Sequence, residues 1–327
     1  MAALLAMAVA AVPSGASSAD ASASASCTPK TNIEAIVDDS GSMGFTDESR
    51  LRVEAMDLLI NALPGQTQLG AVEFGSELFE KPAADTIFPP EPVAVNAAAM
   101  KSSLDTLIQA DNGATDYNGA FAKADADNPT SQARIFLTDG GHDEGEYKET
   151  HLAHNVPTYV VGFSPGLAAA EDQARLQKIA DDTGGTFFPL PDASALQPTM
   201  TKIEAALTCQ TPPREFTDLL KAGQSKVHSV PVGASTKALQ IVLSWTSSLD
   251  KFKLSGLRLI AHRKVVAAGR PKVRKLQVKK ESGQTFLVAK VSGLRKGTLR
   301  FSVKAATVGS GEPKVKLTTQ VGRDSGH

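Results

Sequence analysis

Strand-like and helix-like hydrophobic patterns alternate along the first two thirds of the chain. Residues 135–137 and 159–161 are continuously apolar, which is typical of strands in a sheet covered on both faces. In residues 49–63, by contrast, apolar side chains recur at three- and four-residue spacing, as on one side of a helix. The pattern predicts strands at 32–37, 69–74, 134–138, 157–163 and 186–190, and helices at 49–63, 95–108, 118–126, 168–183 and 193–207. Such alternation predicts an α/β fold with a doubly wound, mostly parallel sheet flanked by helices.

The helical pattern nearly vanishes after a short proline-containing linker at residues 210–213. Short segments of alternating hydrophobicity follow, separated by turns rich in glycine, serine and lysine. They predict strands at 226–232, 238–245, 254–262, 272–278, 285–291, 298–304 and 315–321. About seven short strands in this length favour an all-β sandwich or jelly roll.

The charge of the chain divides at the same linker. Residues 1–212 carry 11 Lys and Arg against 29 Asp and Glu, a net charge of −18, whereas residues 213–327 carry 23 against 6, a net charge of +17. Such asymmetry indicates two domains. We therefore predict a leader at 1–26, an α/β domain at 27–209, the linker at 210–213 and a basic β domain at 214–327. The opposite charges suggest that the two domains could dock.

The first residues resemble a targeting signal. Residues 3–12 form an apolar run that is too short for a membrane span, which needs about 20 residues. Small residues follow, and Ala23-Ser24-Ala25 offers a cleavage site, although a basic segment before the apolar run is missing. Cys27 could instead carry a lipid anchor, but the leucine that usually lies three positions before such a cysteine is absent. We predict a secreted protein, extracellular or at the cell surface, with no other stretch able to span a bilayer.

Two cysteines, Cys27 and Cys209, bracket the acidic region. In a secreted protein they are expected to form a disulfide that ties the two ends of that region together. The alternative is a pair of free buried thiols.

Oxygen-bearing side chains gather in loops that follow the predicted strands. Asp38, Ser40 and Ser42 follow the first strand, Asp139 follows the strand at 134–138, and Thr115 lies in the loop before the helix at 118–126. In a doubly wound sheet, ligands bind beyond the carboxyl ends of the strands, near the point where the strand order reverses. Two carboxylates and three hydroxyls, without imidazole or thiol, suit Mg²⁺, Mn²⁺ or Ca²⁺. Helix caps and polar turns are the alternative explanation for each loop taken alone.

The three loops together are similar to those of von Willebrand factor type A domains with an intact metal-ion-dependent adhesion site (MIDAS). The similarity covers about residues 31–207 and rests on D-x-S-G-S-M at 38–43, G-x-T-D at 113–116 and L-T-D-G at 137–140. It implies that Ser40, Ser42 and Thr115 bind the metal directly, and that Asp38 and Asp139 bind it directly or through water. The metal, Mg²⁺ in the first instance, would accept a Glu or Asp carboxylate from a protein partner.

The resemblance has further implications for neighbouring residues. In this fold the termini meet opposite the metal site, so a Cys27–Cys209 bridge would clasp that base. Asp39 falls between the metal-binding positions and is predicted to be dispensable for metal. The expected partner-binding rim consists of Phe45, Tyr117, Asp143 and Glu144. We therefore predict a non-enzymatic adhesion or protein-binding function.

Other chemistry is possible at three places. G-x-S-x-G at 162–166 would make Ser164 the nucleophile of a serine hydrolase, but the only later histidines lie outside the α/β region. His151 and His154 form H-x-x-H rather than the zinc motif H-E-x-x-H, and together with His142 they are interpreted as exposed histidines. No phosphate-binding glycine loop of the G-x-x-x-x-G-K type occurs.

The basic region offers a separate binding function, in which case the metal would be structural. Its basic run at 270–275 could bind an anionic cell-surface polymer. Nothing in the sequence supports nucleic-acid binding, and Trp245, in an alternating strand, is interpreted as a core residue.

Overall fold

The first half of the chain folds around one six-stranded sheet. The computed structural model describes residues 27–75, 83–109, 113–142, 146–148, 155–163, 170–190, 193–261, 264–267, 276–311 and 314–323. The sheet has the order β3-β2-β1-β4-β5-β6. Its strands are β1 (Asn32–Asp38), β2 (Gln68–Phe74), β3 (Ala84–Pro92), β4 (Ala133–Thr138), β5 (Thr158–Phe163) and β6 (Thr186–Leu190). All neighbouring strands are parallel except β3, which runs antiparallel to β2, so the predicted fold class is confirmed.

Helices cover both faces of this sheet, and each face has its own hydrophobic core. One core joins α2 (Leu51–Ala62), α3 (Val93–Leu107) and α6 (Leu196–Leu207) to the side of β1 that carries Ile33, Ala35 and Val37. The other joins α4 (Tyr117–Asp127) and α5 (Ala170–Thr183) to the side that carries Ile36. Successive residues of a strand point to opposite faces, so a strand buried on both sides must be apolar throughout. None of the helices in the described part of the chain is long and apolar enough to cross a lipid bilayer.

The second half is a sandwich of two antiparallel sheets around a third core. One sheet has the order β11-β10-β14-β8 and the other the order β12-β13-β9-β15-β7. The strands are β7 (Arg214–Leu220), β8 (Ser225–Val232), β9 (Ala238–Ser244), β10 (Lys251–Ala261), β11 (Lys264–Ala267), β12 (Gln277–Ser282), β13 (Phe286–Ser292), β14 (Gly297–Thr307) and β15 (Val315–Arg323). Trp245 is 5% exposed and packs in this core, as predicted.

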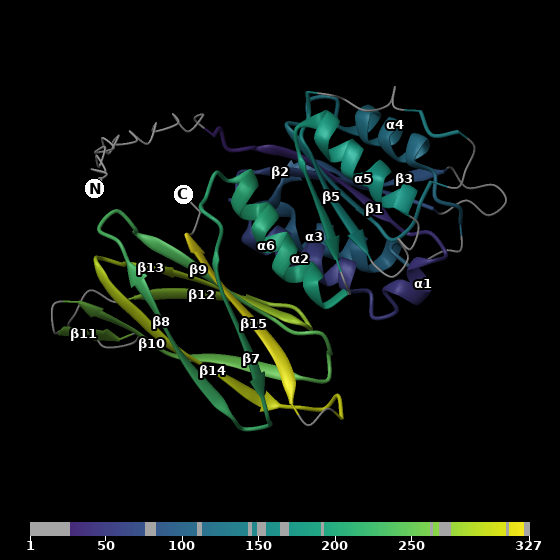
Figure 1. Ribbon diagram of the computed structural model, residues 1–327. Coiled ribbons are helices and arrows are strands. Elements are labelled where there is room, and N and C mark those ends of the chain that lie inside the picture. Colours follow the sequence, from purple (N-terminus) through teal and green to yellow (C-terminus); the bar gives the residue numbers. More distant parts are fainter. Residues whose placement is uncertain are drawn as a thin grey trace, which may run out of the picture.

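The five-stranded sheet packs directly against helices α2 and α6 (Figure 1). Val242, Phe286 and Val288 of the sandwich are buried in the same core as α2 and α6. Polar contacts surround this patch: Glu54 Oε2 accepts hydrogen bonds from the backbone N–H of residues 284 and 285, at 2.8 and 3.1 Å. The contact is therefore built mainly from apolar burial and hydrogen bonds rather than from the opposite net charges of the two halves.

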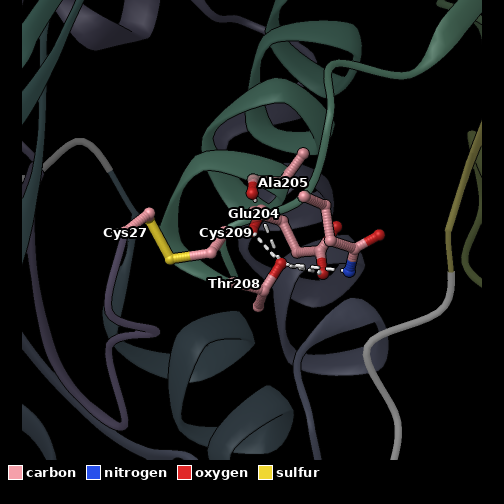
Figure 2. Close-up of a disulfide and its surroundings, with 6 residues drawn as sticks. Cys27, Glu204, Ala205, Thr208 and Cys209 are labelled. Carbon is pink, nitrogen blue, oxygen red and sulfur yellow. Dashed lines mark hydrogen bonds between the residues drawn. A yellow bond between two sulfur atoms is a disulfide. The ribbon is translucent and has the colours of Figure 1, made fainter. Parts of the chain in front are cut away.

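A disulfide joins Cys27 to Cys209, at the carboxyl end of α6 (Figure 2). The helix ends there because Cys209 adopts a left-handed backbone conformation with φ of 57°, and its N–H donates to the carbonyl of Ala206. Just after Cys27, the N–H of Lys30 donates to the carbonyl of Leu207. The predicted disulfide is confirmed, and it lies at the amino edge of the sheet, where β1 begins.

Candidate metal centre

The three oxygen-rich loops meet at the carboxyl edge of the six-stranded sheet. β1 and β4 are parallel neighbours with Val37 opposite Leu137, so Asp38 and Asp139 follow the same edge of two adjacent strands. The chain crosses from β1 to β2 on one side and reaches β4 on the other, which makes this the point where strand order reverses. A backbone hydrogen bond of 3.2 Å from Gly41 N to Gly113 O ties the first loop to the loop that carries Thr115.

Asp38 is fully buried and both of its carboxylate oxygens are held. Oδ1 accepts a hydrogen bond from Ser40 N at 2.9 Å, and Oδ2 accepts one from Thr138 Oγ1 at 2.6 Å. Burial, together with the negative charge of Asp139, raises the pKa of Asp38 to about 7. Two buried carboxylates therefore repel each other at this position.

Asp139 is the second buried carboxylate, and it continues the chain of contacts through the serines. Ser42 Oγ donates to Asp139 Oδ1 at 2.7 Å and lies 3.1 Å from Ser40 Oγ. Thr46, at the end of the short helix α1 (Met43–Thr46), donates its hydroxyl to Asp139 Oδ2. In the described part of the chain, no lysine, arginine or histidine hydrogen-bonds or ion-pairs with Asp38 or Asp139.

Thr115 faces the same space from the other side. It is 3% exposed. A Cβ placed on Gly140 would lie 3.8 Å from Thr115 Oγ1 and 4.0 Å from Ser42 Oγ, so both hydroxyls converge beside this glycine. The structure thus brings all five predicted oxygen donors to one place. The described residues contain no cluster of three or more His, Cys, Asp or Glu side chains suited to a metal, so any metal bound here must use the hydroxyls as well.

A family model for the von Willebrand factor type A domain matches residues 32–202, more than half of the chain. The chain belongs to the von Willebrand factor type A (VWA) domain family. No curated protein matches it.

Several solved structures resemble the chain at low sequence identity. A von Willebrand factor type A protein from Catenulispora acidiphila matches with 17% identity and a TM-score of 0.44, over 89% of this chain and 62% of that one. Proximal thread matrix protein 1 from the mussel byssus, in a form with a zinc-occupied MIDAS motif, matches with 20% identity and a TM-score of 0.44 over 60% and 51%. The pilus adhesin SpaC from Lactobacillus rhamnosus GG matches with 11% identity and a TM-score of 0.45 over 91% and 44%. This chain spans only about half of their lengths.

Asp39, between the donors of the VWA domain's first loop, has a different set of partners. Its Oδ1 lies 2.8 Å from Arg52 Nη2, and its Oδ2 accepts the N–H of Gln109 at 2.9 Å. Arg52 Nη1 also lies 3.1 Å from Asp47 Oδ2, and Asp47 accepts the N–H of Leu51 at the start of α2. Asp39 therefore anchors the first loop to α2. Sequence reasoning did not identify Arg52, because nothing in the helical pattern marks it as buried.

Of the two predicted rim residues that the structure describes, one is exposed and the other is buried. Phe45 is 90% exposed and stands on α1 directly after the first loop. Tyr117 is fully buried, and its hydroxyl donates to the carbonyl of Gly140, so its prediction as a rim residue is wrong. It packs edge-on against Phe136, and its hydrogen bond to Gly140 supports the loop that follows Asp139. Asp143 and Glu144 lie outside the described residues.

His142 was interpreted as an exposed histidine, and this is wrong. Its side chain is 2% exposed, and Nδ1 accepts the N–H of Tyr117 at 3.1 Å. The imidazole therefore braces the start of α4 beside the VWA site. His151, His154 and the Ser164 of the hydrolase alternative lie outside the described residues.

Two threonines near the site were missed by sequence reasoning. Thr138 holds Asp38 from the neighbouring strand, and Thr46 caps Asp139. Each carries a signal in retrospect: Thr138 directly precedes Asp139 at a strand end, and Thr46 comes four residues after Ser42, one helical turn away.

Proposed function

We propose that the protein is a secreted, non-enzymatic adhesion or protein-binding protein whose VWA domain holds a divalent cation and uses it to bind a partner's carboxylate. One observation carries this proposal: Asp38 and Asp139 are buried close together, no basic side chain among the described residues pairs with either, and three hydroxyls converge on them. Burying two like charges without compensation is costly. A bound cation would offset that cost.

The donor chemistry selects the class of metal. Carboxylate and hydroxyl oxygens suit hard cations, so Mg²⁺ is the first candidate and Mn²⁺ and Ca²⁺ are the alternatives. Ser40, Ser42 and Thr115 would hold the metal directly, and Asp38 and Asp139 would hold it directly or through water. When bound, the metal supplies a Lewis-acidic position for a Glu or Asp side chain of the partner.

The surroundings of the site would decide which partners reach it. Phe45 presents an exposed aromatic ring for apolar contact with the partner. Asp143 and Glu144, which follow the Asp139 loop in sequence, would favour basic surroundings around the incoming carboxylate. The leader predicted at residues 1–26 favours secretion, and the disulfide favours an extracellular location because disulfides persist in oxidising compartments.

Metal titration of the full chain tests the proposal. A cation at 100 times its Kd should stabilise the fold by about 2.7 kcal/mol, and EDTA should reverse the shift in thermal unfolding. Ser42→Ala and Asp38→Asn should lose this shift. Asp38→Asn should also be at least as stable as the wild type in EDTA, because it removes one of two facing buried charges.

Asp105→Asn is the matched control, since it makes the same chemical change at an exposed side chain that pairs only at the surface with Arg50. Its metal response should equal that of the wild type. Absence of any shift with Mg²⁺, Mn²⁺ or Ca²⁺, or an unchanged shift in both site variants, would refute the proposal.

A further inference from the structure

The outer face of the four-stranded sheet lies on the side of the sandwich away from helices α2 and α6, which contact the other sheet (Figure 1). Along β14, Leu299, Phe301 and Val303 are buried in the sandwich core. The alternate residues of β10 and β14 therefore form an outer face turned toward solvent, with an irregularity in the β10 register between Ser255 and Arg258.

Strand register places like residues directly opposite each other on this face. Lys253 pairs with Lys304, Ser255 with Ser302, and Arg258 with Arg300. Directly opposite side chains in an antiparallel pair have Cβ atoms about 4.5–5.5 Å apart and point to the same face. We call these three rows the basic ladder: Lys253, Ser255, Arg258, Arg300, Ser302 and Lys304.

The ladder has no acidic partner within its own sheet. Strands β8, β10, β11 and β14 contain seven Lys and Arg and no Asp or Glu. In the described residues, the ion pairs of Glu215, Asp218 and Glu281 are made with other partners, and none reaches the ladder. Like charges placed opposite each other destabilise a sheet, so this face holds a repulsion that an anion would relieve.

We propose that the basic ladder binds a linear anionic polysaccharide, independently of the metal centre. The four cations contact its carboxylate or sulfate groups, and Ser255 and Ser302 between them hydrogen-bond to the chain. Arg300 and Lys304 are four residues apart on β14, so the two charged rows lie about 14 Å apart along the strand. A linear polymer can engage both rows at once.

The face favours a polysaccharide over a single-stranded nucleic acid. Nucleic-acid bases are bound largely by stacking on exposed aromatic rings. The aromatic side chains of these strands, namely His228, Phe252 and Phe301, are 6%, 5% and 1% exposed. The described face thus offers charge and hydroxyls without a stacking platform. The basic run at 270–275 lies outside the described residues and forms no part of the proposed site.

Binding of the full chain to heparin and hyaluronan, in EDTA and 50 mM salt, tests the proposal, with neutral dextran as the blank. Heparin tests sulfate and hyaluronan tests carboxylate as the recognised group. The variant Arg258→Gln/Lys304→Gln should raise the Kd for the polymer that binds by about 30-fold, because one basic residue beside an anionic surface contributes about a factor of five. The control Lys316→Gln/Arg323→Gln removes the same charges from exposed positions of β15 in the other sheet, and should change the Kd by less than about threefold.

Equal weakening by the two variants would overturn the proposal, because net charge alone would then explain binding. Failure of both heparin and hyaluronan to bind would also overturn it, as would tighter binding of single-stranded DNA that Arg258→Gln/Lys304→Gln abolishes. A second measurement does not depend on variants. Bound heparin or hyaluronan should protect Lys253 and Lys304 of the wild type from acetylation and leave Lys316 reactive, and equal protection of all three would contradict the assignment.

Discussion

Arg52 is fully buried between two carboxylates that are also fully buried, Asp39 and Asp47. Replacing it with methionine keeps much of the apolar stem but leaves both carboxylates without their cation. Breaking a buried ion pair in this way costs about 3–5 kcal/mol, because the desolvated carboxylates lose the cation that offsets their charge. Two charge-assisted hydrogen bonds, at 2.8 and 3.1 Å, give a loss of the same size.

Urea unfolding of Arg52→Met in EDTA measures this loss. Far-UV circular dichroism follows the helices of the VWA domain, and the fluorescence of Trp245, the only tryptophan, follows the sandwich. With a slope of about 3 kcal/mol/M, the midpoint of the helical transition should fall by about 1–1.7 M. Asp105→Asn, which removes an exposed partner of Arg50, should cost less than about 1 kcal/mol.

A rescue variant separates charge from packing. Adding Asp39→Asn and Asp47→Asn to Arg52→Met removes the stranded charges, so the triple variant should be more stable than Arg52→Met alone. The reasoning is refuted if Arg52→Met loses less than about 1 kcal/mol, or if the triple variant is no more stable than the single one.

Three further predictions concern stability elsewhere in the chain. Burial raises the pKa of Glu34 from 4.5 to about 8. Its contribution to the free energy of unfolding is therefore full below pH 4.5 and is lost as the pH rises to about 8. Glu34→Gln should flatten this decrease in stability with pH, measured by unfolding at several pH values. Glu54→Ala should cost about 2–3 kcal/mol in thermal unfolding and speed amide exchange at Thr285, because it removes the acceptor of three interface hydrogen bonds, two from backbone N–H groups and one from the Thr285 hydroxyl. Reduction of Cys27–Cys209 should cost about 2–5 kcal/mol, whereas the Cys27→Ser/Cys209→Ser variant should not respond to reductant.

The parallel strands and the long helices of the VWA domain were predictable because buried strands and amphipathic helices have distinct periods. β3 (Ala84–Pro92) was missed, since its Pro89, Pro90 and Pro92 argue against a strand. The prolines are tolerated because β3 is the edge strand of the sheet, where a proline without an N–H does not break a hydrogen bond between two central strands. β12 (Gln277–Ser282) extends beyond the end predicted for the strand at 272–278, because its alternating lysines do not mark where a strand stops; residues 272–275 lie outside the described part of the chain.

The sequence predicted which residues lie at the candidate site, but not which way all of their side chains point. Asp38 and Asp139 had to follow neighbouring strands once the alternation was recognised, and the structure places them so. Tyr117 was assigned to the surface because it lies two residues after Thr115, beside the metal loops. It is the first residue of α4, and sequence alone does not say which way a side chain at the start of a helix points; the structure turns this one inward.

The disulfide determines how a mechanical pull travels through the molecule. Cys27 precedes β1 and Cys209 follows α6, so tension applied before residue 27 passes through the sulfur–sulfur bond to the linker. The six-stranded sheet and its oxygen-rich loops are bypassed by that load. The pull then reaches β7, which is held to β15 by register pairs from Arg214 to Leu220. Arg214 lies opposite Val321, so tension directed toward the end of β15 loads this antiparallel pair at one end. Under force, the sandwich would therefore unzip from that end while the loops at the far edge of the VWA sheet kept their shape.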